Sequence, residues 1–290
     1  MSRRCCFLSM DSLDGYVFDD DLAIKPLNDL GWEVSTVSWR AKTVDWNSFE
    51  IVVIRTTWDY QRTPDAFLEV LKKIESSTAR LENSPDVVKW NLDKSYLREL
   101  EENGLRIVPT IWDGVYEQRS FYRWMADLGT DELIVKPNVS ATAEHTYRLA
   151  EFDPSLVEVF AARPFMVQPF LTNIVDEGEY SLFYLGGKYS HTILKSPKDE
   201  DFRVQEEHGG VITAVEPSEK LREAASKAFA MIKMIGPSPL YARVDLVRDE
   251  DDEFALIELE LIEPALYLRM DADAPRRFAA AINNLMTVSK

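Results

Sequence analysis

Cysteine and histidine are scarce in this sequence, which has two cysteines and three histidines among 290 residues. The cysteines are adjacent, Cys5 and Cys6, and neighbours on a strand point to opposite faces, so we do not expect a disulfide. We expect buried thiols in a reducing cytoplasm instead. The histidines show no spacing typical of a zinc site or a catalytic triad. The sequence therefore excludes a disulfide scaffold and does not indicate zinc or triad chemistry.

Long apolar runs and an excess of positive charge are also lacking. No apolar run reaches the length of a membrane span, and the apolar stretch at the N-terminus is too short for a signal peptide. The chain has 33 basic and 50 acidic residues, a net charge of −17. Such a charge argues against a nucleic-acid partner, and no membrane partner is expected. Any phosphate site must be built locally from lysine, arginine and a divalent cation.

Strand-like apolar runs alternate with amphipathic helical stretches, which is the pattern of an α/β (α+β) protein. The run at 50–55 is almost wholly apolar, as expected for a parallel strand covered on both faces. Two adjacent glycines at 186 and 187 predict a hairpin turn. The other expected strands are 31–37, 132–136, 165–168, 181–185, 188–194, 241–247 and 254–262, and the expected helices include 92–103, 118–128, 218–236 and 274–286.

The two last predicted strands carry charge on one face. Alternation places Arg243 with Asp245 on one strand and Glu258 with Glu260 on the next, and a tight hairpin sets Asp245 opposite the glutamates. Glutamates two apart on a strand have α-carbons roughly 6–7 Å apart, so both reach one pair of metal ions. Mg²⁺ takes one or two carboxylates together with phosphate oxygens and water. The same pattern also fits a hairpin with one solvated face, and both interpretations stay open here.

Two lysines and one strand end suggest a nucleotide site. Lys136 ends an apolar strand before Pro137, and Lys94 falls in the first turn of a predicted helix, where a cation is disfavoured unless a phosphate lies nearby. The strand end at 168–171 exposes backbone groups that suit a purine edge, and carboxylates follow it that suit ribose hydroxyls. Surface lysines and an ordinary strand-to-loop exit are the alternatives.

In their order and spacing, these residues resemble the ATP-grasp superfamily, particularly bacterial glutathione synthetase and D-alanine–D-alanine ligase. They are also similar to the branch that contains cycloserine synthetase. The matches run from about residue 50 to 270. The segments that carry the resemblance are Asn91-Leu92-Asp93-Lys94, Val135-Lys136-Pro137, Gln168 to Leu171, Arg243-Val244-Asp245 and Ile257-Glu258-Leu259-Glu260.

The resemblance implies an N-terminal parallel-sheet lobe (1–88), a central ATP-grasp lobe (89–168) and a C-terminal lobe (169–290), the last two α+β and clasping ATP. It implies that ATP phosphorylates a small carboxylate, which an amine then attacks in a cytoplasmic carbon–nitrogen ligase, and it leaves room for a homodimer. The implied site has Lys94 and Lys136 on the phosphates, a hinge of Gln168, Phe170 and Leu171 on adenine, Glu179 on ribose, and Asp245, Glu258 and Glu260 on Mg²⁺, with two ions expected and Mn²⁺ as a substitute.

Arginines complete the expected site. Arg243 is placed to stabilise the transferring phosphoryl group, and Arg203 resembles a phosphate- or substrate-contacting arginine. Arg55 precedes a segment that resembles a substrate-facing loop, and bidentate pairing makes arginine suitable for a carboxylate. Two departures from the family stand out: the loop after Lys136 has no glycine from 138 to 145, and Glu260 occupies the place of the usual asparagine.

Three functions are consistent with these residues: ligation of a carboxylate to an amine, ATP-driven cyclisation of a small amino-acid derivative, and non-catalytic nucleotide binding. The occupied metal and lysine positions argue against the third. The substrate is not named by the sequence, because specificity lies in first-lobe loops that follow no recognisable code.

Overall fold

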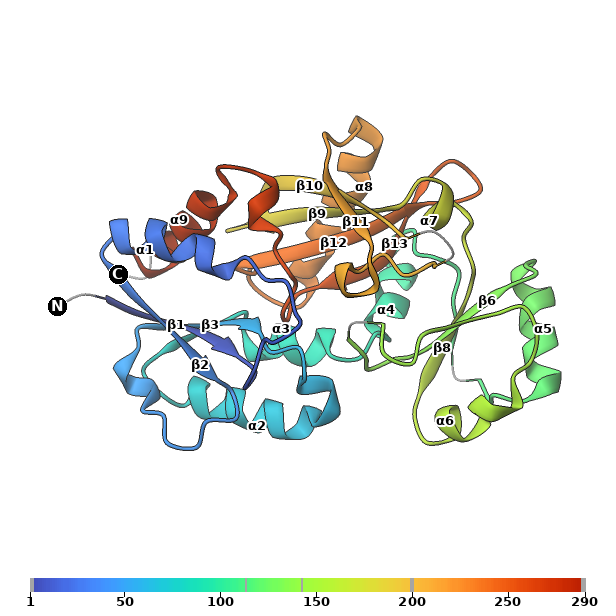
Figure 1. Ribbon diagram of the computed structural model, residues 1–290, viewed down its shortest axis with the longest axis horizontal. Helices are drawn as coiled ribbons and strands as arrows, with labels where there is room; N and C mark the ends of the chain where they lie inside the picture. The colour runs from blue at the N-terminus through green and yellow to red at the C-terminus, as the bar shows by residue number, and fades with distance from the viewer. Residues whose placement is uncertain (1–2, 113, 142, 199–200, 288–290) are drawn as a thin grey trace.

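The computed structural model describes residues 3–112, 114–141, 143–198 and 201–287 and contains three sheets. Figure 1 shows the first sheet at the lower left, the second at the right with α5 and α6, and the third above them, covered by α8. A mixed α/β architecture was predicted, and it is confirmed. Within the described ranges, no helix has both the length and the apolar character that a bilayer crossing needs.

The first sheet is parallel, in the order β2-β1-β3-β4, with helices on both faces. Cys5 and Cys6 lie on opposite faces of β1, in separate cores, which confirms that they do not pair. One core contains α1 and α9, and the other contains α2. The elements are β1 (Arg3–Ser9), α1 (Ile24–Asp29), β2 (Trp32–Ser38), β3 (Ile51–Thr56), α2 (Pro64–Glu75), β4 (Arg80–Glu82) and α9 (Ala274–Thr287).

The second sheet is antiparallel, in the order β5-β8-β6-β7. An aromatic core with Tyr116, Phe121 and Trp124 fills the space between this sheet and its helices. Lys136 lies near the end of β6, one of the two central strands. The elements are β5 (Ile111–Trp112), α5 (Gln118–Leu128), β6 (Leu133–Pro137), β7 (Tyr147–Leu149), α6 (Val157–Ala161) and β8 (Phe165–Pro169).

The third sheet is antiparallel, in the order β11-β10-β9-β12-β13. The predicted hairpin on Gly186 and Gly187 is confirmed: both have positive φ (57° and 78°), which a tight hairpin turn needs and glycine permits. The elements are α7 (Asn173–Asp176), β9 (Glu179–Leu185), β10 (Lys188–Ser196), β11 (Val211–Ala214), α8 (Glu219–Met231), β12 (Tyr241–Arg248) and β13 (Phe254–Glu260).

One predicted helix is wrong in its extent. Residues 92–103 do not form one helix: α3 (Pro85–Asn91) ends first, a turn covers 92–95, and α4 (Tyr96–Glu102) follows. Two contacts explain the break. The Asp93 carboxylate accepts from the Ser95 N–H (2.8 Å), and the Lys94 N–H donates to the Asn138 carbonyl (3.0 Å). Side-chain bonds of the first kind compete with a helix, and Lys94 therefore lies in a turn.

Side chains of α3 and α4 form hydrogen bonds with the open edge of β13, where no further strand of the sheet follows in the described part of the chain. The Tyr96 hydroxyl donates to the Leu259 carbonyl (3.0 Å) and accepts from the Leu259 N–H (2.8 Å). The Asn91 amide donates to the same carbonyl (2.6 Å) and accepts from the Leu261 N–H (2.9 Å). Because buried backbone groups need partners, these bonds hold β13 in place without another strand. The three sheets follow the order of the three predicted lobes, whose bounds stay a prediction.

His191 on β10 is buried and gives the fold a pH dependence that can be measured. Burial lowers its pKa to about 4; its ring stacks on Phe183 (centroids 4.3 Å apart) and its Nε2 lies 3.0 Å from the Leu266 carbonyl. A histidine whose folded pKa lies below its usual value costs stability as the pH falls between those two values.

We therefore expect the free energy of unfolding to fall by about 2 kcal/mol through this group between neutral pH and pH ~5. The variant His191→Gln should lose that part of the pH dependence, as measured by urea unfolding at both pH values. Equal pH dependence in the two proteins would contradict the assignment.

Candidate functional site

A cavity lies where the three sheets meet, and nearly all the predicted site residues line it. They are Lys94, Lys136, Gln168, Phe170, Leu171, Glu179, Arg203, Arg243, Asp245, Glu258 and Glu260. Other residues of the lining that the sequence did not assign are Trp58, Tyr60, Asn91, Lys195, Glu263 and Tyr267.

The hairpin β12–β13 sets the acidic wall of the cavity as predicted. Asp245 is paired with Glu258 and Arg243 with Glu260 across the two strands, with an irregularity just after Asp245. This register places one arginine among three carboxylates. The two glutamates keep about a quarter of their side-chain surface exposed (27% and 26%), whereas Asp245 keeps 3%.

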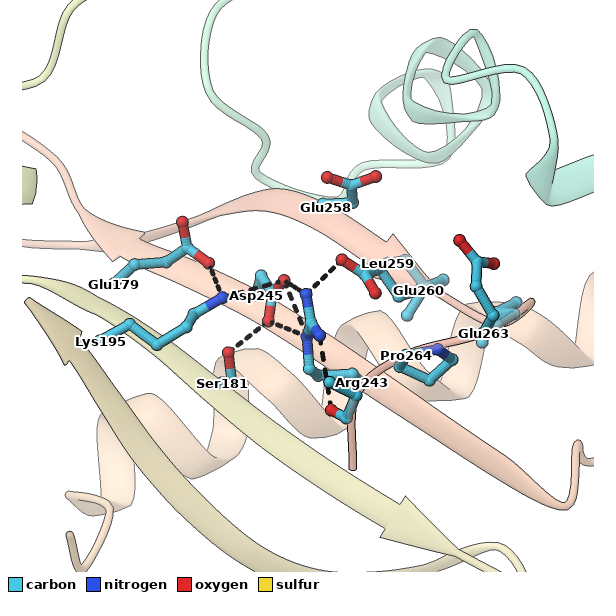
Figure 2. A network of polar contacts seen from close by, with 12 residues as sticks. Glu179, Ser181, Lys195, Arg243, Asp245, Glu258, Leu259, Glu260, Glu263 and Pro264 are labelled. Atoms are coloured by element: carbon cyan, nitrogen blue, oxygen red, sulfur yellow. Dashed lines mark hydrogen bonds and ion pairs between the residues drawn. The ribbon is translucent and has the colours of Figure 1, made fainter. Parts of the chain in front are cut away.

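Asp245 is enclosed by basic and hydroxyl groups. Its carboxylate accepts from Arg243 Nε (3.0 Å) and Nη2 (2.9 Å) and from the Ser181 hydroxyl (2.5 Å), and it lies 3.4 Å from Lys195 Nζ. Although burial opposes ionisation, Arg243 and then Lys195 lower the pKa of Asp245. Figure 2 shows Asp245 at the centre of this network. Asp245 thus binds both Arg243 and Lys195 and fixes their positions.

Lys195 links two predicted site residues. Its ammonium pairs with the Glu179 carboxylate as well as with Asp245, and it is 3% exposed. Burial lowers its pKa, but Asp245 and Glu179 outweigh burial and raise it overall. The sequence left the role of Lys195 undecided, because only the pairing of β9 with β10 brings Lys195 opposite Glu179.

The two predicted phosphate lysines are both buried but differ in their contacts. Lys94 Nζ pairs with Glu258 (3.1 Å) and donates to the Ser140 carbonyl (2.8 Å). Lys136 is 9% exposed and has no ion pair or hydrogen bond through its ammonium among the residues described here. Burial lowers the pKa of Lys136; Glu258 raises it and Lys94 lowers it further. Lys136 is therefore a buried cation with room for an anion.

The predicted adenine hinge lies at the end of β8. The Gln168 amide donates to the Thr110 hydroxyl (3.0 Å), and the Phe170 N–H donates to the Glu132 carbonyl (2.9 Å). Apolar side chains of Val108, Ile134 and Ile257 line the cavity with this segment. The hinge segment thus lines a part of the cavity with apolar walls. Such walls suit a flat aromatic base.

The loop after Lys136 closes part of the cavity without glycine. Ala143 and His145 have positive φ (55° and 58°), a conformation that glycine adopts more easily. Ser140, Ala141 and Ala143 line the cavity, and Thr142 lies outside the described residues. Ser140 contacts Lys94, so the loop and the first lysine are coupled.

Three comparisons place the chain among known proteins. A family model described as the N-terminal domain of D-cycloserine synthetase DcsG matches residues 5–83. The cycloserine biosynthesis protein DcsG of Streptomyces lavendulae is 30% identical over 280 residues, which cover 91% of this chain and 93% of that protein. The chain belongs to the DcsG family of ATP-grasp ligases.

Solved structures agree with this family. The crystal structure of D-cycloserine synthetase DcsG superposes with a TM-score of 0.84 at 26% identity, covering 98% of this chain and 99% of the other. The ATP-grasp ligase PsnB, complexed with a minimal precursor, Mg and ADP, gives 0.65 at 17% identity over 98% of both chains, a likeness of fold alone. The predicted family and fold are confirmed, and the chain is an ATP-dependent ligase that forms carbon–nitrogen bonds.

The arginines that were candidates for substrate contact lie in different settings. Arg55 does not line the main cavity: it is 1% exposed, pairs with Asp20 (2.9 Å) and donates to the Pro264 carbonyl (2.8 Å). Its guanidinium pairs with a residue 35 positions away, and Arg55 lines a smaller pocket beside the main cavity, so the substrate role of Arg55 stays a prediction. Arg203 does line the cavity, paired with Asp201 (2.8 Å). Arg269, left undecided, pairs with Asp19 and Glu206.

The donor set fits a divalent cation in part. Among the described residues, no three carboxylate, imidazole or thiol groups form a ready-made metal cage. Glu258 and Glu260 nevertheless offer two partly exposed carboxylates, and burial raises the pKa of Glu260 to about 7, opposed by Arg243 and supported by Glu258. Two carboxylates suit Mg²⁺, which completes its shell with phosphate oxygens and water. The metal role of Asp245 stays a prediction.

We expect Lys195→Met to destabilise the protein by about 3–5 kcal/mol, because it leaves Glu179 and Asp245 buried without their shared cation. Urea unfolding measures the change. Lys188→Met, at the exposed start of the same strand, is the matched control and should change stability by less than about 0.5 kcal/mol. Equal stabilities of the two variants would refute the importance of this ion pair.

Proposed function

We propose that the cavity binds Mg-ATP and that the enzyme transfers the γ-phosphoryl group to a carboxylate, or a comparable oxygen, of a small substrate. An amine nitrogen then displaces the phosphate. The observation that carries this proposal is the buried Lys136, whose ammonium lines the cavity and pairs with no acid of the described chain. A buried cation is costly unless an anion meets it, and a phosphate supplies one.

The nucleotide is proposed to lie between the second and third sheets. Lys94 and Lys136 bind the phosphates, and the hinge of Gln168, Phe170 and Leu171 holds adenine. Glu179 accepts the ribose hydroxyls with the carboxylate oxygen that Lys195 leaves unused. All six residues line one cavity, which supports this arrangement.

Glu258 and Glu260 are the proposed ligands of Mg²⁺, with Asp245 as a third and two ions as the expected number. Mg²⁺ held by these residues would neutralise charge on the phosphates. Lys94, now paired with Glu258, is then free to turn to phosphate oxygens. Arg243 is held by Asp245 and Glu260 at the same wall, so its guanidinium is positioned for the charge that develops on the transferring phosphoryl group.

The reaction balances without a protein nucleophile. The substrate oxygen attacks the γ-phosphorus and ADP leaves; the amine nitrogen then attacks the activated carbon, phosphate leaves, and the nitrogen loses a proton. The chain's own work is to align the groups, to neutralise charge and to exclude water.

Ring closure within one substrate is the second candidate, and the 30% identity to a cycloserine biosynthesis protein over nearly the whole length favours it. Incubation of candidate acids and amines with Mg-ATP, followed by mass analysis, separates the two. A product that contains one substrate molecule minus a leaving group indicates cyclisation, and a product that joins two indicates ligation.

We expect Glu258→Gln to lower substrate-dependent ADP release by about 100-fold or more, because one metal ligand and the partner of Lys94 are weakened together. The fold should be retained, as circular dichroism will show. ADP release at the wild-type rate would remove Glu258 from the metal site.

We expect Lys136→Met to weaken the binding of Mg-AMPPNP by about 10-fold, or ~1.4 kcal/mol, in a calorimetric titration. Lys89→Met changes an exposed lysine of α3 and serves as control. An unchanged dissociation constant in Lys136→Met refutes the phosphate role.

A further inference from the structure

Glu263, three residues after β13, is a buried acid of the cavity wall that the nucleotide chemistry does not use. It is 8% exposed and lines the cavity, yet its carboxylate makes no hydrogen bond or ion pair with any described residue. In Figure 2 it follows Glu258 and Glu260 along the chain, and no dashed contact reaches it. Burying a carboxyl group without a hydrogen-bond partner costs free energy, so its presence in the cavity wall indicates that a ligand supplies the partner.

The backbone around Glu263 is held by donors from β3, from the segment that follows β3 and from β12 of the third sheet. The Trp58 indole N–H donates to the Glu263 carbonyl (2.9 Å), Arg55 donates to the Pro264 carbonyl (2.8 Å), and the Tyr241 hydroxyl donates to the Ile262 carbonyl (2.8 Å). All three donors are buried. The backbone that carries the Glu263 side chain is therefore held in place by these contacts.

Aromatic side chains share this corner of the cavity. Trp58 and Tyr60, 8% and 5% exposed, come from the segment that follows β3 and line the same cavity. The Tyr60 hydroxyl has no hydrogen-bond partner within the described part of the chain. Aromatic faces attract organic cations, and a phenol oxygen accepts an N–H, but neither indole nor ring carbon is a ligand for Mg²⁺.

We propose that Glu263, Trp58 and Tyr60 form a subsite for the ammonium group of the small substrate. The substrate class is then that of primary-amine compounds such as amino-acid derivatives, held at Glu263 while another part of the molecule reaches the phosphates. The nearest cations do not satisfy Glu263: Lys94 pairs with Glu258, and Arg243 pairs with Asp245 and Glu260. This inference rests on the proposed function for the direction in which the substrate extends.

The test measures binding by calorimetry, with and without saturating Mg-AMPPNP. The probes are glycine, D-serine, L-serine and methylammonium, with N-acetylglycine and the two N-acetylserines as matched compounds without an ammonium group. We expect at least one amino compound to bind, its N-acetyl form to bind at least 10-fold more weakly, and Glu263→Gln to weaken the amino compound at least 10-fold. Glu263→Asp, which keeps the charge, should weaken it less than Glu263→Gln does.

Glu207→Gln is the control, since Glu207 is an exposed glutamate of the same lining, and it should change affinity less than 2-fold. The proposal is overturned if no ammonium probe binds the wild type, if N-acetyl forms bind equally well, or if Glu263→Gln binds the probes normally. It is also overturned if Glu263→Gln raises only the Mg²⁺ concentration needed for nucleotide binding, because Glu263 is then a metal ligand. Failure of the wild type to bind Mg-AMPPNP refutes the proposed function separately, while probe binding without nucleotide still tests Glu263.

Discussion

The contact between Arg243 and Asp245, two residues apart on β12, organises the charges of the cavity. Asp245 holds the guanidinium with two bonds and also faces Lys195, while the other side of Arg243 reaches Glu260. Loss of one partner from such a buried pair leaves an uncompensated charge and costs about 3–5 kcal/mol. The pair therefore fixes the positions of the groups on both strands of the hairpin.

Apart from these ion pairs, one buried lysine and one buried glutamate of the cavity have no hydrogen-bond or ion-pair partner among the described residues. They are Lys136 on the second sheet and Glu263 beside the third, and burial lowers the pKa of Lys136 and raises that of Glu263. In a chain with net charge −17, a triphosphate binds only where local cations and Mg²⁺ offset the long-range repulsion. The ion pairs offset one another along the cavity wall, so the two unpaired side chains are where a bound ligand would supply the missing partner.

Much of this arrangement could be predicted from the sequence, because a strand has a period of two. Alternation alone put Arg243 and Asp245 on one face of β12, and the short connection put the glutamates opposite. Contacts between segments far apart in the sequence could not be predicted from it. The Asn138 carbonyl accepts from the Lys94 N–H where the sequence predicted a helix, and Asp20 pairs with Arg55 from 35 residues away. Glu263 follows the last strand in an irregular segment, where no periodicity indicates which way its side chain points.

Lys136 and Glu263, which have no partner among the described residues, come from different parts of the fold. Lys136 comes from the second sheet, and its proposed partner is a phosphate of ATP. The Glu263 and Pro264 carbonyls accept from Trp58 and Arg55, which lie within the region that the DcsG N-terminal model matches. The segment after β3 also reaches the loop after Lys136, because the Gln61 amide donates to the Glu144 carboxylate (3.3 Å), so changes in this segment are expected to act on both corners, at Lys136 and at Glu263.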